Sequence, residues 1–133
     1  MITVTAAILE KDGRILAARR KLRKHLAGYW EFPGGKLEGG ETPQQCLARE
    51  LQEELGIVAA IGDFVAESIY DYGHQKVRLV AYRATHLNGE FNPKDHDELK
   101  WLLPAELNTL KWAPADIPLL DAIRDVAGRS YTW

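Results

Sequence analysis

Two short apolar runs open the chain and are separated by a turn signal. Residues 2 to 9 and 14 to 18 are rich in Ile, Val, Leu and Ala, and Asp12-Gly13 lies between them. An Asp-Gly pair between two such runs is typical of a tight hairpin turn. The pattern therefore predicts two antiparallel strands.

The stretch between Thr42 and Gly56 carries both a helix start signal and a helix stop signal. Thr42 is followed by Pro43, and Gln45 stands three residues after the threonine, which is the arrangement of a capping box. Gly56 suits the left-handed residue that follows many helices. A helix is predicted here, and one apolar face of it is formed by three residues spaced four apart, Leu47, Leu51 and Leu55.

The rest of the chain alternates between strand patterns and helical patterns. The predicted elements are two strands rich in Val, Ile, Ala and Tyr over residues 57 to 70 and 76 to 86, a short strand over residues 99 to 103, a helical turn from Pro104 and a helix over residues 115 to 127. Together these segments predict a mixed β-sheet flanked by helices.

The composition is that of one globular domain spanning residues 1 to 133. The chain has 46% hydrophobic and 27% charged residues and no internal repeat. A net charge of −2 gives no field to hold duplex nucleic acid, and the apolar start is too short to cross a bilayer, so neither partner is expected. The single cysteine, Cys46, excludes an intrachain disulfide and is typical of a reducing compartment, so a cytoplasmic location is expected.

The predicted central helix carries the clearest chemical pattern in the chain. Three carboxylates, Glu50, Glu53 and Glu54, lie at spacings that put them on one helix face. Clustered oxygen ligands of this kind suit Mg²⁺, or Mn²⁺ in its place. Just before the helix, Gly34-Gly35 allows the backbone to approach a phosphate or a metal, and Lys36 adds a cation there. A merely solvated helix face would explain the glutamates but not the glycine turn beside them.

The full motif is Gly35, five residues, Glu41, seven residues, and then Arg49-Glu50-Leu51-Gln52-Glu53-Glu54-Leu55-Gly56-Ile57. It fills every specified position of the Nudix box, so the chain resembles the Nudix hydrolases. The resemblance implies an α+β Nudix fold, an α/β/α sandwich. It extends to the MutT-type nucleoside triphosphate pyrophosphohydrolases, and within them to the CTP and modified-pyrimidine enzymes, through Arg19-Arg20, His25, the run from Trp30 to Lys36 and the segment from Ala113 to Leu120.

The resemblance implies a Mg²⁺-dependent reaction that converts a nucleoside triphosphate and water to the monophosphate and pyrophosphate. The Gly34 carbonyl, Glu50, Glu53 and Glu54 are the expected metal ligands. Arg49, paired with Glu53 or Glu41, is expected to steady them. The proton of the attacking water is expected to pass to either Glu53 or Glu98, with Asp97 as the alternative to Glu98. His96, Asp97 and Glu98 form a polar triplet that is typical of a loop.

The resemblance also implies which residues bind the nucleotide. They are Arg20, His25 and Lys36 for the phosphates, Phe32 as a platform for the base and Asp116 as the group that reads the base. Asp116 also fits a helix N-cap. An ionised carboxylate accepts hydrogen bonds but cannot donate one to uracil O4, so cytosine-type bases are expected to be preferred, with 8-oxo-dGTP as a further substrate.

Two other functions fit the sequence. A dinucleoside polyphosphate or ADP-ribose hydrolase would share the motif, and the aromatic pair Tyr70 and Tyr72 would suit a second base. A module that senses a nucleotide without hydrolysing it would share the fold. The oligomeric state, monomer or homodimer, is left open by the sequence.

Overall fold

The computed structural model describes the backbone of residues 1–22 and 24–129, and side chains up to residue 124. The elements in chain order are β1 (Ile2–Lys11), β2 (Arg14–Arg20), β3 (Trp30–Glu31), β4 (Gly34–Lys36), α1 (Pro43–Leu55), β5 (Val58–Asp71), β6 (Lys76–Asn88), β7 (His96–Leu102), the 3₁₀ helix η1 (Pro104–Thr109) and α2 (Ile117–Arg129). Residues 130–133, which the predicted single domain includes, lie outside the described part of the chain.

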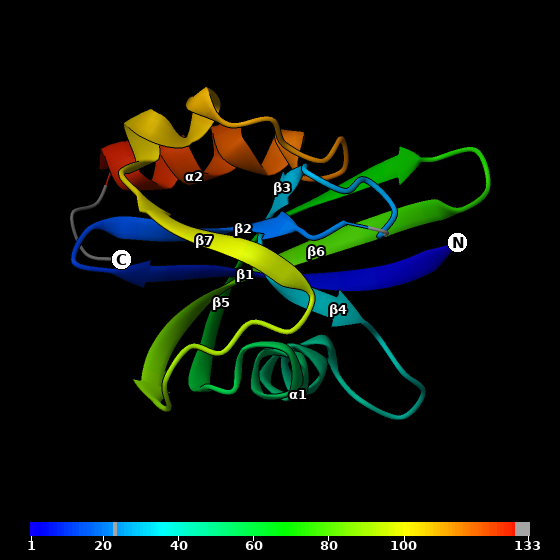
Figure 1. Ribbon diagram of the computed structural model, residues 1–133, viewed down its shortest axis with the longest axis horizontal. Coiled ribbons are helices and arrows are strands. Elements are labelled where there is room, and N and C mark those ends of the chain that lie inside the picture. The colour runs from blue at the N-terminus through cyan, green and yellow to red at the C-terminus, as the bar shows by residue number, and fades with distance from the viewer. Residues whose placement is uncertain (23, 130–133) are drawn as a thin grey trace.

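Seven strands of the described chain form one mixed sheet with β1 at its centre. The order is β3-β2-β1-β6-β5, with β4 paired to β1 and β7 paired to β2. β1 runs parallel to β6 and antiparallel to β2 and β4. Figure 1 shows α1 on one side of the sheet and α2 with η1 on the other. The prediction of an α/β/α sandwich is confirmed.

The alternation of side chains along β1 divides the core into two layers. Ala6 and Ile8 pack toward α2, whereas Ala7 and Leu9 pack toward α1, and all four are fully buried. Because successive side chains of a strand point to opposite faces, one strand supplies both layers. The three leucines of α1 close the second layer.

The caps of α1 are those that the sequence predicts. The Gln45 N–H donates to Thr42 Oγ1 at 3.1 Å, and the Thr42 N–H donates to Gln45 Oε1 at 2.9 Å. Gly56 has a φ of 74°, in the left-handed region. These two ends fix the start and the length of the helix that carries the carboxylates.

The structure also differs from the predicted elements. The short strands β3 and β4 have no counterpart in the prediction, because two or three residues show no periodicity. The segment from His96 to Glu98 is not a loop but the start of β7, where pairing with β2 overrides its polar composition. No helix in the described part of the chain is long and apolar enough to cross a membrane.

Candidate active site

Arg49 organises the carboxylates of α1. Its Nη1 donates to Glu50 Oε1 at 2.9 Å and to Glu53 Oε2 at 3.0 Å. Its Nε and Nη2 donate to the two carboxylate oxygens of Glu41 at 3.1 and 2.7 Å. These hydrogen bonds, together with one from the Glu38 N–H, lower the pKa of Glu41 to about 2. Arg49 therefore ties the loop before α1 to the acidic face of the helix, as the sequence predicts.

Glu54 lies beside an acidic residue that sequence reasoning missed. The Asp95 carboxyl, together with burial, raises the pKa of Glu54 to about 7. The Lys94 N–H donates to the Glu54 carbonyl at 3.0 Å, which holds this loop against the end of α1. Glu54 Oε2 is buried and has no hydrogen-bond partner among the described residues. Only the three-dimensional pairing of loop and helix reveals Asp95, since no sequence pattern marks it.

Two glycines let β4 pass close to the carboxylates. A Cβ at Gly35 would lie 2.2 Å from Glu50 Cδ, and a Cβ at Gly34 would lie 1.9 Å from the carbonyl oxygen of Thr5. Neither position has room for a side chain. A groove beside β4 is lined by Gly34, Gly35 and Lys36 of this strand and by Glu50 and Glu54 of α1.

The groove brings together some of the predicted metal ligands. It is lined by Gly34, Glu50 and Glu54, and by Lys36 and Asp95. The carboxylate of Glu53 lies against Arg49 instead. Among the described residues no three His, Cys, Asp or Glu side chains converge as a ready metal cluster. The buried, unpartnered oxygen of Glu54 is nevertheless of the hard donor type that suits a divalent cation.

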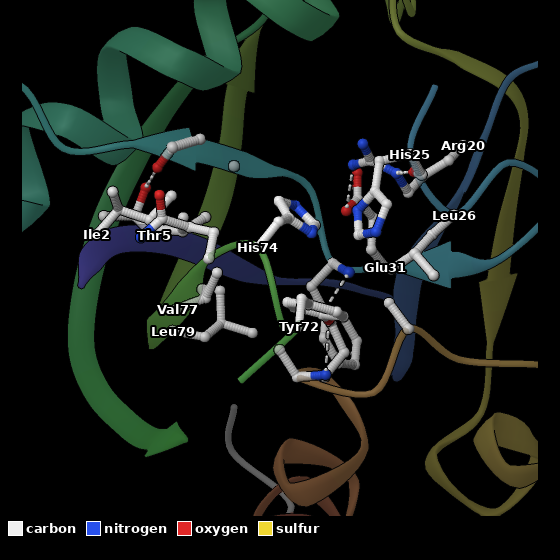
Figure 2. Close-up of a pocket in the computed structure, with 18 residues that line it drawn as sticks. Ile2, Thr5, Arg20, His25, Leu26, Glu31, Tyr72, His74, Val77 and Leu79 are labelled. Carbon is white, nitrogen blue, oxygen red and sulfur yellow. Dashed lines mark hydrogen bonds and ion pairs between the residues drawn. The ribbon is translucent and has the colours of Figure 1, made fainter. Parts of the chain in front are cut away.

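A second cavity of about 270 Å³ adjoins the groove. Figure 2 shows the residues that line this cavity. Apolar side chains such as Val4, Phe32 and Leu79 line the cavity together with polar side chains such as His25 and Asp116. Four residues line both the cavity and the groove: Arg20, Glu31, Gly34 and Gly35. The two spaces therefore form one continuous site with an apolar end and an acidic end.

Asp116 lies buried at the apolar end, where it is only 5% exposed. The N–H of Phe32, the residue that follows β3, donates to Asp116 Oδ2 at 3.0 Å. This oxygen therefore bonds the segment after β3 rather than capping α2. Burial raises the pKa of Asp116 well above its ordinary value, and the nearby charge of Glu31 adds to the effect. The raised pKa makes the neutral acid more accessible than it is for an exposed aspartate, and the neutral acid can donate a hydrogen bond as well as accept one.

Aromatic rings shape the rest of this cavity. Phe32 is almost fully buried, and its ring packs on Trp112 with centroids 4.5 Å apart. Tyr72 accepts the Ala115 N–H at 3.0 Å, which holds its hydroxyl next to the segment before α2. The His25 ring stands edge-on to Tyr72 at 5.3 Å. The predicted substrate residues Arg20, His25, Phe32 and Asp116 thus line the cavity, and Lys36 lines the groove.

Glu98 lies away from both spaces. In the β2–β7 register Glu98 pairs with Arg19. Arg19 lies on the same face of β2 as Ile15 and Ala17, which pack in the core layer on the α2 side. Glu98 Oε1 accepts from Arg19 Nη1 at 3.2 Å, and Asp97 accepts from Arg19 Nε at 2.6 Å. The structure does not bring Glu98 or Asp97 to the carboxylates of α1.

The two glycines of β4, the helix of carboxylates and the sandwich around them suit a hydrolase acting on phosphate compounds. The NUDIX domain family model matches residues 1–123, and the chain belongs to this family of Nudix hydrolases.

Relatives of known name agree with this membership. The chain is 44% identical to the CTP pyrophosphohydrolase of Escherichia coli K12 over 92% of its own length and 90% of that protein's. It is 43% identical to the putative 8-oxo-dGTP diphosphatase 2 of Mycobacterium tuberculosis, over 85% and 81% of the two chains. The solution structure of the E. coli ORF135 protein superposes with a TM-score of 0.85 at 42% identity, covering 99% and 93% of the two chains.

Proposed function

We propose that this Nudix hydrolase is a Mg²⁺-dependent nucleoside triphosphate pyrophosphohydrolase that prefers cytosine-type nucleotides, CTP and dCTP with their 5-substituted forms, and accepts 8-oxo-dGTP. It would yield the nucleoside monophosphate and pyrophosphate. The relatives named for CTP and for 8-oxo-dGTP support this substrate class. Its role would be the removal of modified nucleotides from the cell's pool.

One observation carries the proposal, namely the continuity of the apolar cavity with the acidic groove. A base occupying the cavity beside Asp116 would have its phosphates directed past Arg20 and Gly34 toward Glu50 and Glu54. An apolar pocket with few polar groups at its end is the usual form of a small-molecule site. A nucleotide has the same two-part chemistry, an aromatic base at one end and a polyanion at the other.

The acidic end fits a divalent cation. Glu50, Glu54 and the Gly34 backbone line the groove, and Glu53 would join them if its side chain turned from Arg49. A bound Mg²⁺ neutralises phosphate oxygens and lowers the pKa of a coordinated water. Asp95, next to Glu54, is a further candidate oxygen donor that the sequence does not mark.

The residues of this chain have separate roles in the proposed reaction. Arg49 holds Glu50 in place, and Glu53, whose side chain is 55% exposed, turns from Arg49 and accepts the proton of the attacking water. Lys36, Arg20 and His25 bind phosphate oxygens. The bond broken is expected to be that at the β-phosphorus, so water oxygen enters the pyrophosphate.

The cytosine preference depends on the protonation of Asp116. In its ionised form the carboxyl accepts a hydrogen bond from the N4 amino group of cytosine, and it cannot donate to O4 of uracil. A site built for an amino group leaves a buried polar group unpaired when that amino group is missing. Because burial favours the neutral acid, this discrimination should strengthen as the pH rises.

Turnover assays in ¹⁸O-labelled water test the proposal. CTP, UTP, 8-oxo-dGTP and diadenosine tetraphosphate would each be incubated with Mg²⁺, and the products separated and weighed by mass spectrometry. We expect CMP and labelled pyrophosphate from CTP. Label in CMP would overturn attack at the β-phosphorus, and faster cleavage of diadenosine tetraphosphate than of any triphosphate would favour the dinucleotide hydrolase. Binding of CTP without any product would favour the sensing module.

A further inference from the structure

Three side chains form a hydrogen-bonded chain beneath the junction of cavity and groove. His96 Nε2 lies 2.8 Å from Glu31 Oε2, and Arg20 Nη1 lies 2.9 Å from Glu31 Oε1. Arg20 Nε also donates to the His25 carbonyl at 2.5 Å. A carboxylate only accepts, so Nε2 of His96 is the donor. Figure 2 shows Arg20, His25 and Glu31 gathered at one side of the cavity.

A β-bulge places His96 in this chain. Arg19 pairs with Glu98, but Arg20 pairs with His96, so Asp97 is an extra residue in β7. Without the bulge, His96 and Glu98, two positions apart, would face the same side of the strand. With it, His96 faces the Arg20 side while Glu98 stays with Arg19. Bulges often re-aim a side chain in this way beside an active site.

The burial of His96 makes this bond hard to replace. Its side chain lines the groove but is only 3% exposed, whereas the side chains of Arg20 and Glu31 are 26% and 21% exposed and line both spaces. Glu31 also lies near the carboxyl of Asp116, which offers it no positive charge. The donors on its two oxygens therefore keep Glu31 in position. Glu31 in turn keeps the long Arg20 side chain from moving.

We propose that His96 is a positioning residue for nucleotide binding: it holds Glu31, and Glu31 holds the Arg20 guanidinium where the phosphates of the substrate pass. This inference rests on the proposed function, since it requires a nucleotide in the site. A guanidinium fixed in advance loses less conformational freedom on binding an anion than a mobile one does. His96 would thus lower the KM for the nucleotide through its effect on Arg20.

A histidine that only fills the core would behave differently. Its replacement would lower the melting temperature, and any kinetic effect would be the same whether or not Arg20 is present. The positioning role predicts that the kinetic effect disappears when Arg20 is absent. A double-mutant cycle separates the two roles.

The test measures kcat and KM for CTP with Mg²⁺ in His96→Leu, His96→Gln, Arg20→Ala and the double variant with His96→Leu and Arg20→Ala. We expect His96→Leu to raise KM by at least about tenfold with kcat within about threefold of the unmodified enzyme. His96→Gln, whose amide nitrogen can replace Nε2, should restore KM to within about threefold. In the Arg20→Ala background, His96→Leu should add less than about twofold.

An unchanged KM in His96→Leu, or the same increase in both backgrounds, would overturn the proposal. If His96→Leu does not fold, Glu31→Gln takes its place, since it keeps the size of the side chain and removes the charge that holds Arg20. It should show the same KM increase and the same loss of effect in the Arg20→Ala background. If the unmodified protein binds CTP but does not hydrolyse it, the proposed function fails, and the same cycle on CTP dissociation constants decides the role of His96. No binding of CTP would contradict both.

Discussion

The backbone of Phe32 and the carboxyl of Asp116 are joined by a 3.0 Å hydrogen bond across 84 positions of sequence. The bond fixes Oδ2 of Asp116 at the apolar end of the cavity, where burial keeps the carboxyl from ionising readily. Under the proposed function, the protonation state of this one group would decide which bases the cavity can bind.

The first prediction concerns that protonation. Burial raises the pKa of Asp116, and above this pKa the carboxylate accepts hydrogen bonds but cannot donate them. At such pH values kcat/KM for CTP should exceed that for UTP by at least about tenfold. As the pH falls through this pKa, the neutral acid donates to O4 of uracil and the difference should narrow. The ratio of kcat/KM for CTP and UTP would be measured between pH 6 and pH 9.

Asp116→Asn is the matched control, because an amide donates at every pH. This variant should show a small CTP preference that does not vary with pH, with its dependence on Mg²⁺ intact. Equal kcat/KM for the two nucleotides in the unmodified enzyme at all pH values would remove Asp116 from base recognition.

The second prediction distinguishes the two carboxylates that the sequence left open as the base. Glu53→Gln keeps the size of the side chain but removes a charge next to Arg49, and turnover should fall by at least about a hundredfold. Glu98→Gln makes the same chemical change on the strand face that pairs with Arg19, and should retain turnover within about threefold. Steady-state kinetics with CTP would compare them. The opposite ranking of the two variants would return the role to Glu98.

The melting temperature of Glu53→Gln should stay close to that of the unmodified enzyme. The side chain of Glu53 is 55% exposed, and exposed ion pairs contribute little to stability. A large fall would mean that lost structure, and not lost chemistry, explains the kinetics.

Much of the fold follows from local signals in the sequence. The cap residues of α1 and the four-residue spacing of the leucines on its buried face are signals between residues close in the sequence. Thr42, Gln45 and Gly56 therefore predict the helix correctly. The apolar strands β1 and β2 are equally evident, because each is a continuous apolar run on one side of the Asp12-Gly13 turn. These local signals also place Glu50, Glu53 and Glu54 on one face of the helix.

The parts that sequence reasoning missed depend on contacts between distant segments. Asp95 lies near Glu54 because the Lys94 N–H bonds the end of α1, and Glu31 joins the site because β3 pairs with β2. The bulge at Asp97 reverses which side of β7 faces the groove, so His96 enters the site and Glu98 leaves it. A register shift of one residue is invisible in composition or spacing.

The third prediction is a pH dependence of stability that comes from Glu41. Arg49 lowers the pKa of Glu41 from 4.5 to about 2, so the ionised form is favoured in the folded state. The resulting stabilisation is fully present above about pH 4.5 and is lost as the pH falls through about 2. Glu41→Gln should therefore melt at a lower temperature than the unmodified protein at pH 7, and the difference should shrink toward pH 2.

Glu38→Gln serves as the control for this series. Glu38 is 69% exposed and lies 4.0 Å from Arg49, so its replacement should change the melting temperature little at any pH. Thermal melts at intervals between pH 2 and pH 7 would make the comparison. A difference between Glu41→Gln and the unmodified protein that does not vary with pH would contradict the role of the ion pair.

The fourth prediction concerns divalent cations at Glu54. Because Glu54 Oε2 is buried without a described partner, a cation that binds there should raise the melting temperature. Mg²⁺ at about 100 times its dissociation constant corresponds to about 2.7 kcal/mol of stabilisation. Glu54→Gln should weaken the binding of Mn²⁺ by at least about tenfold, measured by calorimetry at pH 8.

Asp95→Asn tests the partner of Glu54 in the same experiment. If Asp95 contributes to the site, Mn²⁺ binding should weaken in this variant as well. Thermal melts that do not respond to Mg²⁺ or Mn²⁺ would contradict a cation site in the groove.

The last prediction compares three glycines that lie within six positions of one another. A methyl group at Gly34 would overlap the Thr5 backbone oxygen at 1.9 Å, so Gly34→Ala must separate β4 from β1, and we expect a loss of about 3 kcal/mol or more in the free energy of unfolding. A methyl group at Gly35 would lie 2.2 Å from Glu50 Cδ, which is a side chain and can move. Gly35→Ala should therefore keep most of the stability and lose at least about tenfold in turnover, because Glu50 is displaced from the groove. At Gly39 nothing lies within 4 Å of the added Cβ, so Gly39→Ala should leave both properties nearly unchanged. Denaturant unfolding and CTP turnover would be measured on the three purified variants, and full activity in Gly35→Ala would show that the position of Glu50 against β4 does not matter for the reaction.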